Sequence, residues 1–289
     1  MRYEGNIYRP PSEAYSYILQ VTIGCAHNKC TFCSMYKAKD FRVRDMADIL
    51  EDLQGARLHY REVRRIFLAD GDALCLSMDK LRTILLEIKR LFPECQRVGV
   101  YATPQDIMAK SEADLKELHD LGVGIIYMGL ESGDPEILQE ICKGISPEVM
   151  IEAAQRVKGS PLKLSVTAIS GLGGQDRWRA HGDHTAAVLS AMDPDYVGLL
   201  TLMVEAGTPL YEDVEAGRFQ LLTPEQVLLE TKRLVEGLHL TQCVFRSNHP
   251  SNYLSLAGTF PQDKPQLLET IDQAVEGLVR LNSEAYRRL

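Results

Sequence analysis

Seven short apolar segments, rich in β-branched and aromatic residues, recur along the chain between polar and glycine-containing stretches. They cover residues 17–23, 64–69, 97–102, 124–130, 162–169, 196–203 and 243–246. Apolar runs of this length and composition, bounded by turn-forming residues, are typical of buried strands. The pattern therefore predicts seven strands.

Stretches with helical periodicity separate most of these strands. Apolar residues recur at intervals of three and four within residues 81–91 and again within residues 267–278. Residues 223–226 (TPEQ) have the form of a capping box with proline at the first helical position, and residues 146–147 (SP) open another helix similarly. Strand followed by helix, without a series of hairpin turns, indicates parallel strands joined by right-handed crossovers. The predicted fold is α/β, a partial or near-complete TIM-type (β/α)6–8 barrel.

The chain has 289 residues, and no internal repeat, low-complexity tract or Gly/Ser-rich linker interrupts this pattern. Barrels of this kind commonly occupy such a length as one domain. We therefore expect a single domain over residues 1–289, with an N-terminal extension at 1–14 and a closing strand and helix at about 240–289.

Composition and charge narrow the setting. The N-terminus lacks the apolar core of a secretory signal, and no apolar run approaches the roughly 20 residues of a membrane span. We expect a cytoplasmic protein, with no membrane contact. The net charge of −8 argues against a nucleic-acid-binding protein whose affinity rests on neutralising phosphates.

Polar and glycine-bearing segments follow six successive strands at the point where each strand should end. They are residues 24–36, 69–74, 102–106, 131–134, 170–174 and 204–210. Because barrels of alternating strands and helices place their reactive groups at the carboxyl ends of the strands, these segments are expected to form one site.

Three cysteines, Cys25, Cys30 and Cys33, follow the first strand with C-x4-C-x2-C spacing. In a reducing compartment such a group more often holds metal than disulfides. Three alternatives remain open. They are structural zinc with His27 as the fourth ligand, a plant-type ferredoxin cluster that needs a further cysteine such as Cys75, and unligated buried thiols. We favour a 4Fe-4S cluster on three thiolates, because the iron left open is the signature of a catalytic metal site.

The cysteine loop resembles that of the radical S-adenosylmethionine (SAM) superfamily. Residues 30–33 keep the aromatic residue, Phe32, that precedes the third cysteine, whereas the gap after Cys25 is one residue longer than usual. The resemblance implies an oxygen-sensitive enzyme with a 4Fe-4S cluster and SAM as cofactors. In such an enzyme the cluster reductively cleaves SAM to a 5'-deoxyadenosyl radical, which abstracts hydrogen from the substrate.

The resemblance also implies SAM contacts at the ends of later strands. Where the family has Gly-Gly-Glu-Pro against the SAM amino group, this chain has residues 70–73, Asp-Gly-Asp-Ala. Residues 129–134 resemble a ribose-binding segment, residues 168–174 a segment near adenine, and residues 203–211 the sixth-strand segments of coproporphyrinogen oxidases and methylthiotransferases. The implied contacts, in addition to Phe32, are Gly71, Asp72, Glu131, Ser132, Ser170 and Gly171.

The sequence gives weaker signals for residues that contact the substrate or a protein partner. Residues 245–254 follow the seventh strand, and within them Arg246 and Asn248 are our candidates for contact with a small-molecule or peptide substrate. Lys143 is interpreted either as a partner for a carboxylate of SAM or substrate, or as a solvated helix end. A low-potential donor, flavodoxin or ferredoxin, is the expected electron source. The basic residues of the run 37–44 are a candidate docking surface for it, or simply solvated.

The remaining histidines and cysteines suggest no second metal site. His181 and His184 are too few for one. The cysteines outside the loop are expected to be core or incidental thiols: Cys75, Cys95, Cys142 and Cys243. The alternative function is a non-catalytic iron-sulfur carrier or regulator on the same barrel. The sequence leaves open the substrate, the oligomeric state and whether SAM is consumed or regenerated.

Overall fold

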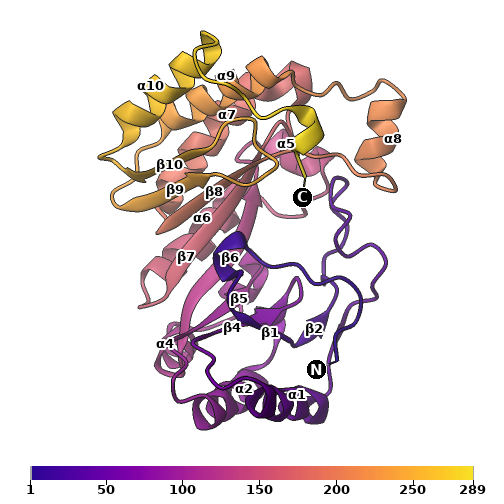
Figure 1. The fold of residues 1–289 in the computed structure, drawn as a ribbon, viewed down its shortest axis with the longest axis vertical. Helices are drawn as coiled ribbons and strands as arrows, with labels where there is room; N and C mark the ends of the chain where they lie inside the picture. The colour runs from indigo at the N-terminus through magenta and orange to yellow at the C-terminus, as the bar shows by residue number, and fades with distance from the viewer. Residues whose placement is uncertain (1, 289) are drawn as a thin grey trace. The chain divides into compact units, whose positions relative to one another are not determined.

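A computed structural model describes residues 2–288, and its main feature is one eight-stranded sheet (Figure 1). Its strand order is β1-β4-β5-β6-β7-β8-β9-β10. The strands are β1 (Tyr17–Gln20), β4 (Arg65–Ala69), β5 (Arg97–Tyr101), β6 (Val123–Glu131), β7 (Lys163–Ser170), β8 (Tyr196–Thr201), β9 (Cys243–Ser247) and β10 (Leu256–Phe260). All seven predicted strands are present, and the α/β class with a mostly parallel sheet is confirmed.

Two details of the strand prediction were wrong. The first predicted strand breaks after Gln20, and its last residues form β2 (Thr22–Ile23), which pairs with β3 (Arg42–Val43) in a separate two-stranded sheet. An eighth strand of the main sheet, β10, pairs antiparallel with β9. Its sequence signal is weakened by Gly258, where an added Cβ would lie 2.9 Å from the Cβ of Asp263. Glycine in a strand commonly marks such a close approach.

The helices alternate with the strands as predicted. They are α1 (Met46–His59), α2 (Met78–Leu91), α3 (Pro104–Met108), α4 (Glu112–Asp120), α5 (Pro135–Glu140), α6 (Pro147–Lys158), α7 (Gly174–Met192), α8 (Pro209–Glu215), α9 (Pro224–Gly237) and α10 (Lys264–Val275), with 3-10 turns η1 (Pro11–Glu13), η2 (Ala73–Cys75) and η3 (Glu284–Tyr286). The predicted capping box at the start of α9 is confirmed, because Thr223 and Gln226 exchange hydrogen bonds between side chain and backbone.

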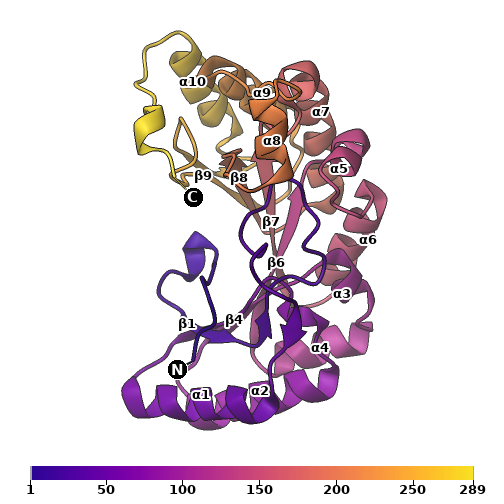
Figure 2. The ribbon, with the colours of Figure 1, turned by 90° about the vertical axis from the view of Figure 1, so that its right-hand side faces the viewer.

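The chain divides into two compact units. Unit 1 contains the residues up to Asn28, Met35–Met128 and Gln155–Leu164, and unit 2 contains Lys29–Ser34, Gly129–Ala154 and the residues from Ser165 onward. In unit 1, α1 and α2 run along one face of β1 and β4 (Figure 2). In unit 2, α7, α9 and α10 lie on one face of β8, β9 and β10 (Figure 1).

The predicted N-terminal extension is packed into unit 1. Glu13 of η1 is fully buried, and its carboxylate accepts hydrogen bonds from Arg97, Tyr127 and Ser16. An added Cβ on Gly99 would lie 3.1 Å from the Glu13 Oε1 atom, so the glycine leaves room for this carboxylate. Tyr127 belongs to an apolar cluster with Ile18, Phe67, Ala69 and Ile125. The N-terminal residues are therefore part of the core of the unit.

No helix in the described part of the chain is both long enough and apolar enough to cross a membrane.

Replacing Glu13 should destabilise unit 1. In Glu13→Ala the Arg97 guanidinium and the Tyr127 hydroxyl lose a buried partner, and we expect the free energy of unfolding in urea to fall by about 3 kcal/mol. Glu62→Ala, which breaks an exposed pair with Arg64, is the control and should change little. Equal stability of Glu13→Ala and wild type would contradict this account of the N-terminal segment.

Candidate functional site

The cysteine loop contributes residues to both units. Cys25 belongs to unit 1, whereas Cys30 and Cys33 belong to unit 2, and all three side chains are partly exposed. In unit 2 the backbone of Thr31 is fixed on both sides. Its N–H donates to the carbonyl oxygen of Ile141 at 3.0 Å, and its carbonyl oxygen accepts from the N–H of Leu210 at 3.1 Å.

A second link within unit 2 joins this loop to the segment after β8. Ser34 donates a hydrogen bond from its hydroxyl to the Glu205 carboxylate. Glu205 lies in residues 203–211, the segment that resembles the sixth-strand segments of related enzymes. The structure therefore brings this segment to the cysteine loop, together with the start of α8.

The donor set fits a 4Fe-4S cluster better than structural zinc. No three Cys, His, Asp or Glu side chains among residues 2–288 are grouped so as to hold a metal ion. Zinc in a structural site needs four ligands converging on one ion. In a 4Fe-4S cluster each thiolate binds a different iron, so three partly exposed thiols on an anchored loop are the appropriate donors. The metal that these three thiols hold stays a prediction.

Asp70, which sequence reasoning did not select, anchors the start of the cysteine loop within unit 1. Its side chain is fully buried at the end of β4, and Oδ2 accepts from Gln20 Nε2 at 3.0 Å, the Gly24 N–H at 3.1 Å and Lys39 Nζ at 2.7 Å. The Asp70 N–H donates to Thr22 Oγ1 at 3.1 Å. Because Gly24 directly precedes Cys25, this carboxylate fixes the point where the loop leaves the sheet.

The basic run after the cysteines does not form a common surface. Lys39 is paired with Asp70, and its side chain is only 10% exposed. Arg44 is buried and paired with Asp52. Arg42 pairs with Glu4 on the surface. Only part of the run therefore faces solvent, and its role in docking a donor stays a prediction.

Gly71 lies against the first cysteine. A Cβ added at this position would be 3.0 Å from the Cβ of Cys25 and 2.7 Å from Cε2 of Tyr36. A side chain here would push the cysteine and the tyrosine ring away, so the glycine permits the segment after β4 to approach the loop. Its contact with SAM stays a prediction.

Asp72 is buried, and its side chain is directed at another acid. Burial raises the pKa of Asp72 from its ordinary value of 3.8 to about 8, and the hydrogen bond and negative charge of Asp106 act in the same direction, against the opposing charge of Lys110. The carboxyl is therefore mainly neutral at pH 7. Its Oδ1 atom is buried without a hydrogen-bond partner among residues 2–288, so one acceptor stays available at the strand end.

Glu131 and Lys143 form an ion pair at the end of β6. Glu131 Oε1 lies 2.9 Å from Lys143 Nζ, and the two side chains are 13% and 16% exposed. Glu131 has a backbone φ of +65°, unusual for a residue with a side chain. An added Cβ on Gly129 would lie only 2.0 Å from Glu131 Oε1. The carboxylate thus occupies the space that the glycine leaves. Of the two interpretations of Lys143, the solvated helix end was wrong, because the ammonium pairs with Glu131 inside the unit.

Ser132 has a structural role next to this pair. It is fully buried, and its Oγ accepts from the N–H of Asp134 at 3.0 Å. Asp134 caps α5 and also binds Arg177 at 2.9 Å and His184 at 3.1 Å. The hydroxyl of Ser132 therefore helps to form the turn into α5, and a direct contact with SAM stays a prediction.

The turn after β7 is held by Glu230, the second residue that sequence reasoning missed. Glu230 is 1% exposed, and its Oε1 accepts from Ser170 Oγ at 2.6 Å and from the Gly171 N–H at 2.8 Å. Its Oε2 lies 3.2 Å from Nδ1 of the buried His181, an ion-pair contact when that histidine is protonated. A charged residue on the buried, apolar stripe of α9 was the signal in the sequence.

The candidate substrate segment divides into two parts. Arg246 and Asn248 are exposed. Ser251 and Asn252 are buried and bind Thr201 at the end of β8, through its N–H and its hydroxyl respectively. Residues 251–252 therefore stabilise the end of β8, whereas a contact of Arg246 or Asn248 with substrate stays a prediction.

Three of the remaining cysteines lie in surroundings that oppose ionisation. Burial raises the pKa of Cys75 to about 12, with the nearby Asp72 and Asp106 adding to the effect, and burial likewise raises the pKa of Cys243 to about 12. Burial also raises the pKa of Cys95. Because the thiolate is the form that binds metal, these thiols are poor candidates for ligands.

Comparison with known proteins decides the family. The family model of the Radical SAM superfamily matches residues 19–181, more than half of the chain. The chain belongs to the radical SAM superfamily. The cofactors of that family, a 4Fe-4S cluster and SAM, are those predicted from the cysteine loop, and the matched region includes all three of its cysteines.

Two curated relatives illustrate the range of the match. An uncharacterized methyltransferase of Pyrococcus horikoshii is 28% identical over 198 residues, which are 68% of this chain and 41% of the relative. The heme chaperone HemW of Bacillus subtilis is 23% identical over 187 residues, or 62% of this chain and 48% of that protein. The chain thus spans less than half the length of either relative.

Solved structures support the fold. The radical SAM methyltransferase TsrM from Kitasatospora setae, with cobalamin and a [4Fe-4S] cluster bound, matches with a TM-score of 0.56 and 18% identity, covering 72% of this chain and 42% of that chain. Coproporphyrinogen III oxidase HemN from Escherichia coli, a radical SAM enzyme, matches with a TM-score of 0.56 and 17% identity, covering 76% and 52%. These similarities confirm the partial-barrel class.

The raised pKa of Asp72 predicts a pH-dependent stability. Folding favours the neutral carboxyl of Asp72. Its contribution to the stability of the folded chain is therefore complete at pH values below its ordinary pKa of 3.8 and is lost as pH rises through about 8. Relative to Asp72→Asn, whose amide resembles the neutral acid, wild type should lose on the order of 2 kcal/mol of unfolding free energy between pH 5 and pH 9. Urea unfolding at each pH measures the difference.

The exposed Asp40→Asn is the control for this series, and it should follow wild type. Parallel pH profiles for wild type and Asp72→Asn would show that the carboxyl is not held neutral.

Proposed function

We propose that the chain is a radical SAM enzyme in which Cys25, Cys30 and Cys33 bind a 4Fe-4S cluster and leave one iron open to SAM. When bound, these cofactors supply an electron to the sulfonium and release a 5'-deoxyadenosyl radical that removes a hydrogen atom from the substrate. The observation that carries the proposal is the three-cysteine loop directly after the first strand, inside the matched region of residues 19–181.

The chain itself would hold the thiols and keep their positions. The thiols would lose their protons on binding metal, and a loop already anchored by backbone contacts would reduce the ordering that binding requires. In unit 2, the hydrogen bonds of Thr31 with Ile141 and Leu210 supply that anchoring for Cys30 and Cys33. In unit 1, Asp70 supplies it for Cys25 through Gly24.

The predicted SAM contacts offer charges that match the ligand. SAM carries an ammonium and a carboxylate on its methionine part. In unit 1 the unpartnered Oδ1 of Asp72 is an acceptor for the ammonium, and a bound cation would favour the ionised form of that acid. In unit 2 Lys143 supplies a cation and Glu131 an anion. In the Ser170–Gly171 turn, Glu230 already binds both the serine hydroxyl and the Gly171 N–H, so this turn would contribute shape rather than free donors.

We also propose a cytoplasmic, oxygen-sensitive protein reduced by flavodoxin or ferredoxin, because a low-potential cluster on partly exposed thiolates needs a reducing compartment and a donor. The substrate remains a small molecule or peptide. The relatives bear the names of a methyltransferase and a heme chaperone. Our proposal therefore concerns the start of radical chemistry and not the transfer that follows it.

A second candidate is an iron-sulfur carrier or regulator without SAM cleavage. Two observations favour it: the family's Gly-Gly-Glu-Pro is Asp-Gly-Asp-Ala at residues 70–73, and Asp72 is engaged with Asp106. The relative named as a heme chaperone is consistent with such a role.

Anaerobic reconstitution with iron and sulfide, followed by dithionite and SAM, tests the proposal. Wild type should turn brown, hold about four irons per chain and form 5'-deoxyadenosine. Alanine replacement of Cys25, Cys30 or Cys33 should remove the cluster and reduce 5'-deoxyadenosine to background, because each thiolate binds its own iron. The exposed Cys142→Ala is the matched control and should keep both.

Two results would overturn the proposal. A colourless protein containing one zinc would restore the structural-metal alternative. A reduced, intact cluster that neither binds SAM nor forms 5'-deoxyadenosine would favour the carrier.

Asp70→Asn tests the anchoring of the loop. The amide can keep only part of the three hydrogen bonds and loses the charge that Lys39 needs, so we expect iron to be lost to a chelator about 10 to 100 times faster than from wild type. Asp40→Asn should behave as wild type, and far-ultraviolet circular dichroism should show that both variants are folded. Unchanged iron loss from Asp70→Asn would show that the anchor is dispensable.

A further inference from the structure

The loop between β9 and β10, residues 248–255, leaves the sheet of unit 2 at the carboxyl end of β9. The turn after β7 leaves it at the same edge, because β7, β8 and β9 are parallel neighbours. Neighbouring strands lie about 4.8 Å apart, so the ends of β7 and β9 are separated by roughly 10 Å. A ligand lying across the end of β8 would therefore reach both segments.

The end of β8 contacts both segments directly. Leu202, the residue after β8, donates from its N–H to the carbonyl oxygen of Ser170 at 2.8 Å. Thr201, the last residue of β8, donates from its N–H to Oγ of Ser251 at 3.2 Å. The loop after β9 is thus joined, through one strand end, to the turn that the family resemblance assigns to SAM.

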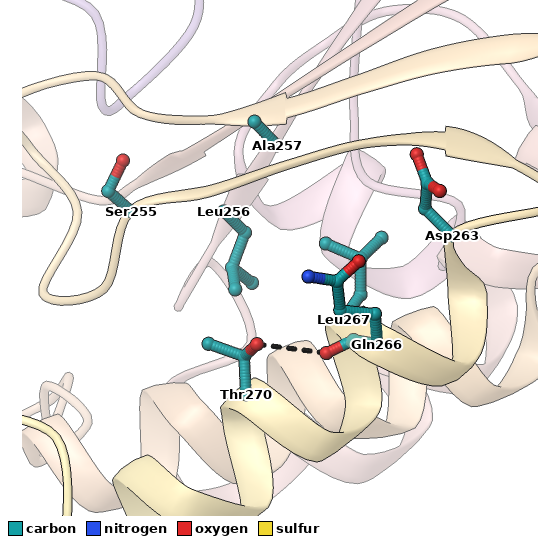
Figure 3. Close-up of a pocket in the computed structure, with 7 residues that line it drawn as sticks. All are labelled: Ser255, Leu256, Ala257, Asp263, Gln266, Leu267 and Thr270. Atoms are coloured by element: carbon teal, nitrogen blue, oxygen red, sulfur yellow. Dashed lines mark hydrogen bonds between the residues drawn. The ribbon is translucent and has the colours of Figure 1, made fainter.

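This loop is held at several points. Residues 251–254 are buried, and the carbonyl oxygen of Ser251 accepts from Nε of Arg287 at 2.6 Å. At the far end of the loop, Leu256 of β10 points toward α10, as Figure 3 shows, and is buried there. A loop fixed in this way holds the side chains that it carries in defined positions.

His249 is a half-buried residue of this loop, and Ser251 orients its ring. The Nδ1 atom accepts the N–H of Ser251 at 3.1 Å and lies 2.9 Å from the hydroxyl oxygen of the same residue. Because a backbone N–H can only donate, Nδ1 carries no proton, and the proton of the neutral ring is on Nε2. Burial lowers the pKa of His249, which agrees with a neutral ring.

The Nε2 atom of His249 is available as a donor. It makes no hydrogen bond with any of residues 2–288, and it is open to solvent, unlike the two ring nitrogens of His181, which are buried. Its proton makes this tautomer unsuited to bind a metal ion through Nε2. Enzymes use a histidine held neutral in this way to polarise a carbonyl oxygen.

We infer that His249 binds the substrate by donating a hydrogen bond from Nε2 to a neutral carbonyl oxygen, such as that of an amide or a ketone. The inference rests on the proposed function for the word substrate, and it names the chemical class that the enzyme accepts. A neutral ring offers no charge to a carboxylate or a phosphate, so a carbonyl is the better match. The contact would hold the substrate across the end of β8, next to the turn at Ser170.

Nitrogen-15 NMR of histidine-labelled, anaerobically reconstituted protein with SAM in excess tests this inference. The signals of His249 are assigned by their loss in His249→Asn. We expect the proton to be on Nε2 at pH 7, and we expect the neutral probe N-acetylglycinamide to shift the Nε2 signal until binding saturates. Erythritol, which has no carbonyl group, should leave the signal unchanged. A proton on Nδ1, or no response to N-acetylglycinamide, overturns the inference.

Two substitutions separate the donor of the ring from its acceptor. In His249→Asn the amide oxygen can replace Nδ1 and keep the hydrogen bond from Ser251, but the donor at Nε2 is lost. Binding of N-acetylglycinamide, measured by isothermal titration calorimetry, should therefore weaken about tenfold. In His249→Gln an amide N–H can reach the place of Nε2, so binding should stay within about threefold of wild type.

His239→Asn, at an exposed histidine of unit 2, is the matched control and should bind N-acetylglycinamide as wild type does. Thermal denaturation should show that all three variants fold as wild type. Equal binding of the probe by wild type and His249→Asn contradicts the inferred contact. Tighter binding of succinate than of N-acetylglycinamide to wild type contradicts the neutral carbonyl class.

The test is independent of the proposed function. Failure of wild type to cleave SAM would remove the radical enzyme but not the carbonyl contact. An enzyme that cleaves SAM and does not bind N-acetylglycinamide would remove only the carbonyl contact.

Discussion

The buried carboxylate of Asp70 is the interaction on which the candidate site depends most. A carboxylate without water is costly unless its oxygens accept hydrogen bonds or face a cation. Here Oδ2 receives the Gly24 N–H, Gln20 and Lys39, all from segments that flank the cysteine loop. These donors offset part of the cost of burial, since Oδ1 has no hydrogen-bond partner among residues 2–288, and they can do so only when the loop begins at this position. One side chain at the end of β4 thus fixes where Cys25 can lie.

The same principle recurs at other strand ends, where polar residues are held by a partner from a distant segment. Glu131 is held by Lys143, Ser170 and Gly171 by Glu230, and Ser132 by the backbone of Asp134. Each partner limits the freedom of a group that the family resemblance assigns to SAM. A site built in this way is ordered before its ligands arrive, which lowers the entropy lost on binding.

The sequence predicted the features that local pattern determines. Seven strands, the capping box of α9 and the cysteine loop follow from periodicity and spacing over a few residues. It did not predict β10, because the glycine needed for close packing against α10 also weakens the strand signal. Nor did it predict that Asp70 and Glu230 are anchors, since the donors to Asp70 Oδ2 are 31 to 50 residues away and those to Glu230 Oε1 are 59 and 60 residues away. The sequence suggested that the side chain of Lys39 is solvated, whereas the fold buries most of it against Asp70. Long-range pairing of polar groups is what a single sequence conceals.

The central claim is that three thiolates leave one iron of the cluster open to SAM. Mössbauer spectroscopy of protein reconstituted with iron-57, recorded before and after SAM is added, measures this most directly. The account predicts that about one quarter of the iron signal shifts on addition of SAM, as one iron gains nitrogen and oxygen ligands while the other three keep their sulfur environment. A spectrum in which all of the iron is unaffected by SAM would contradict it.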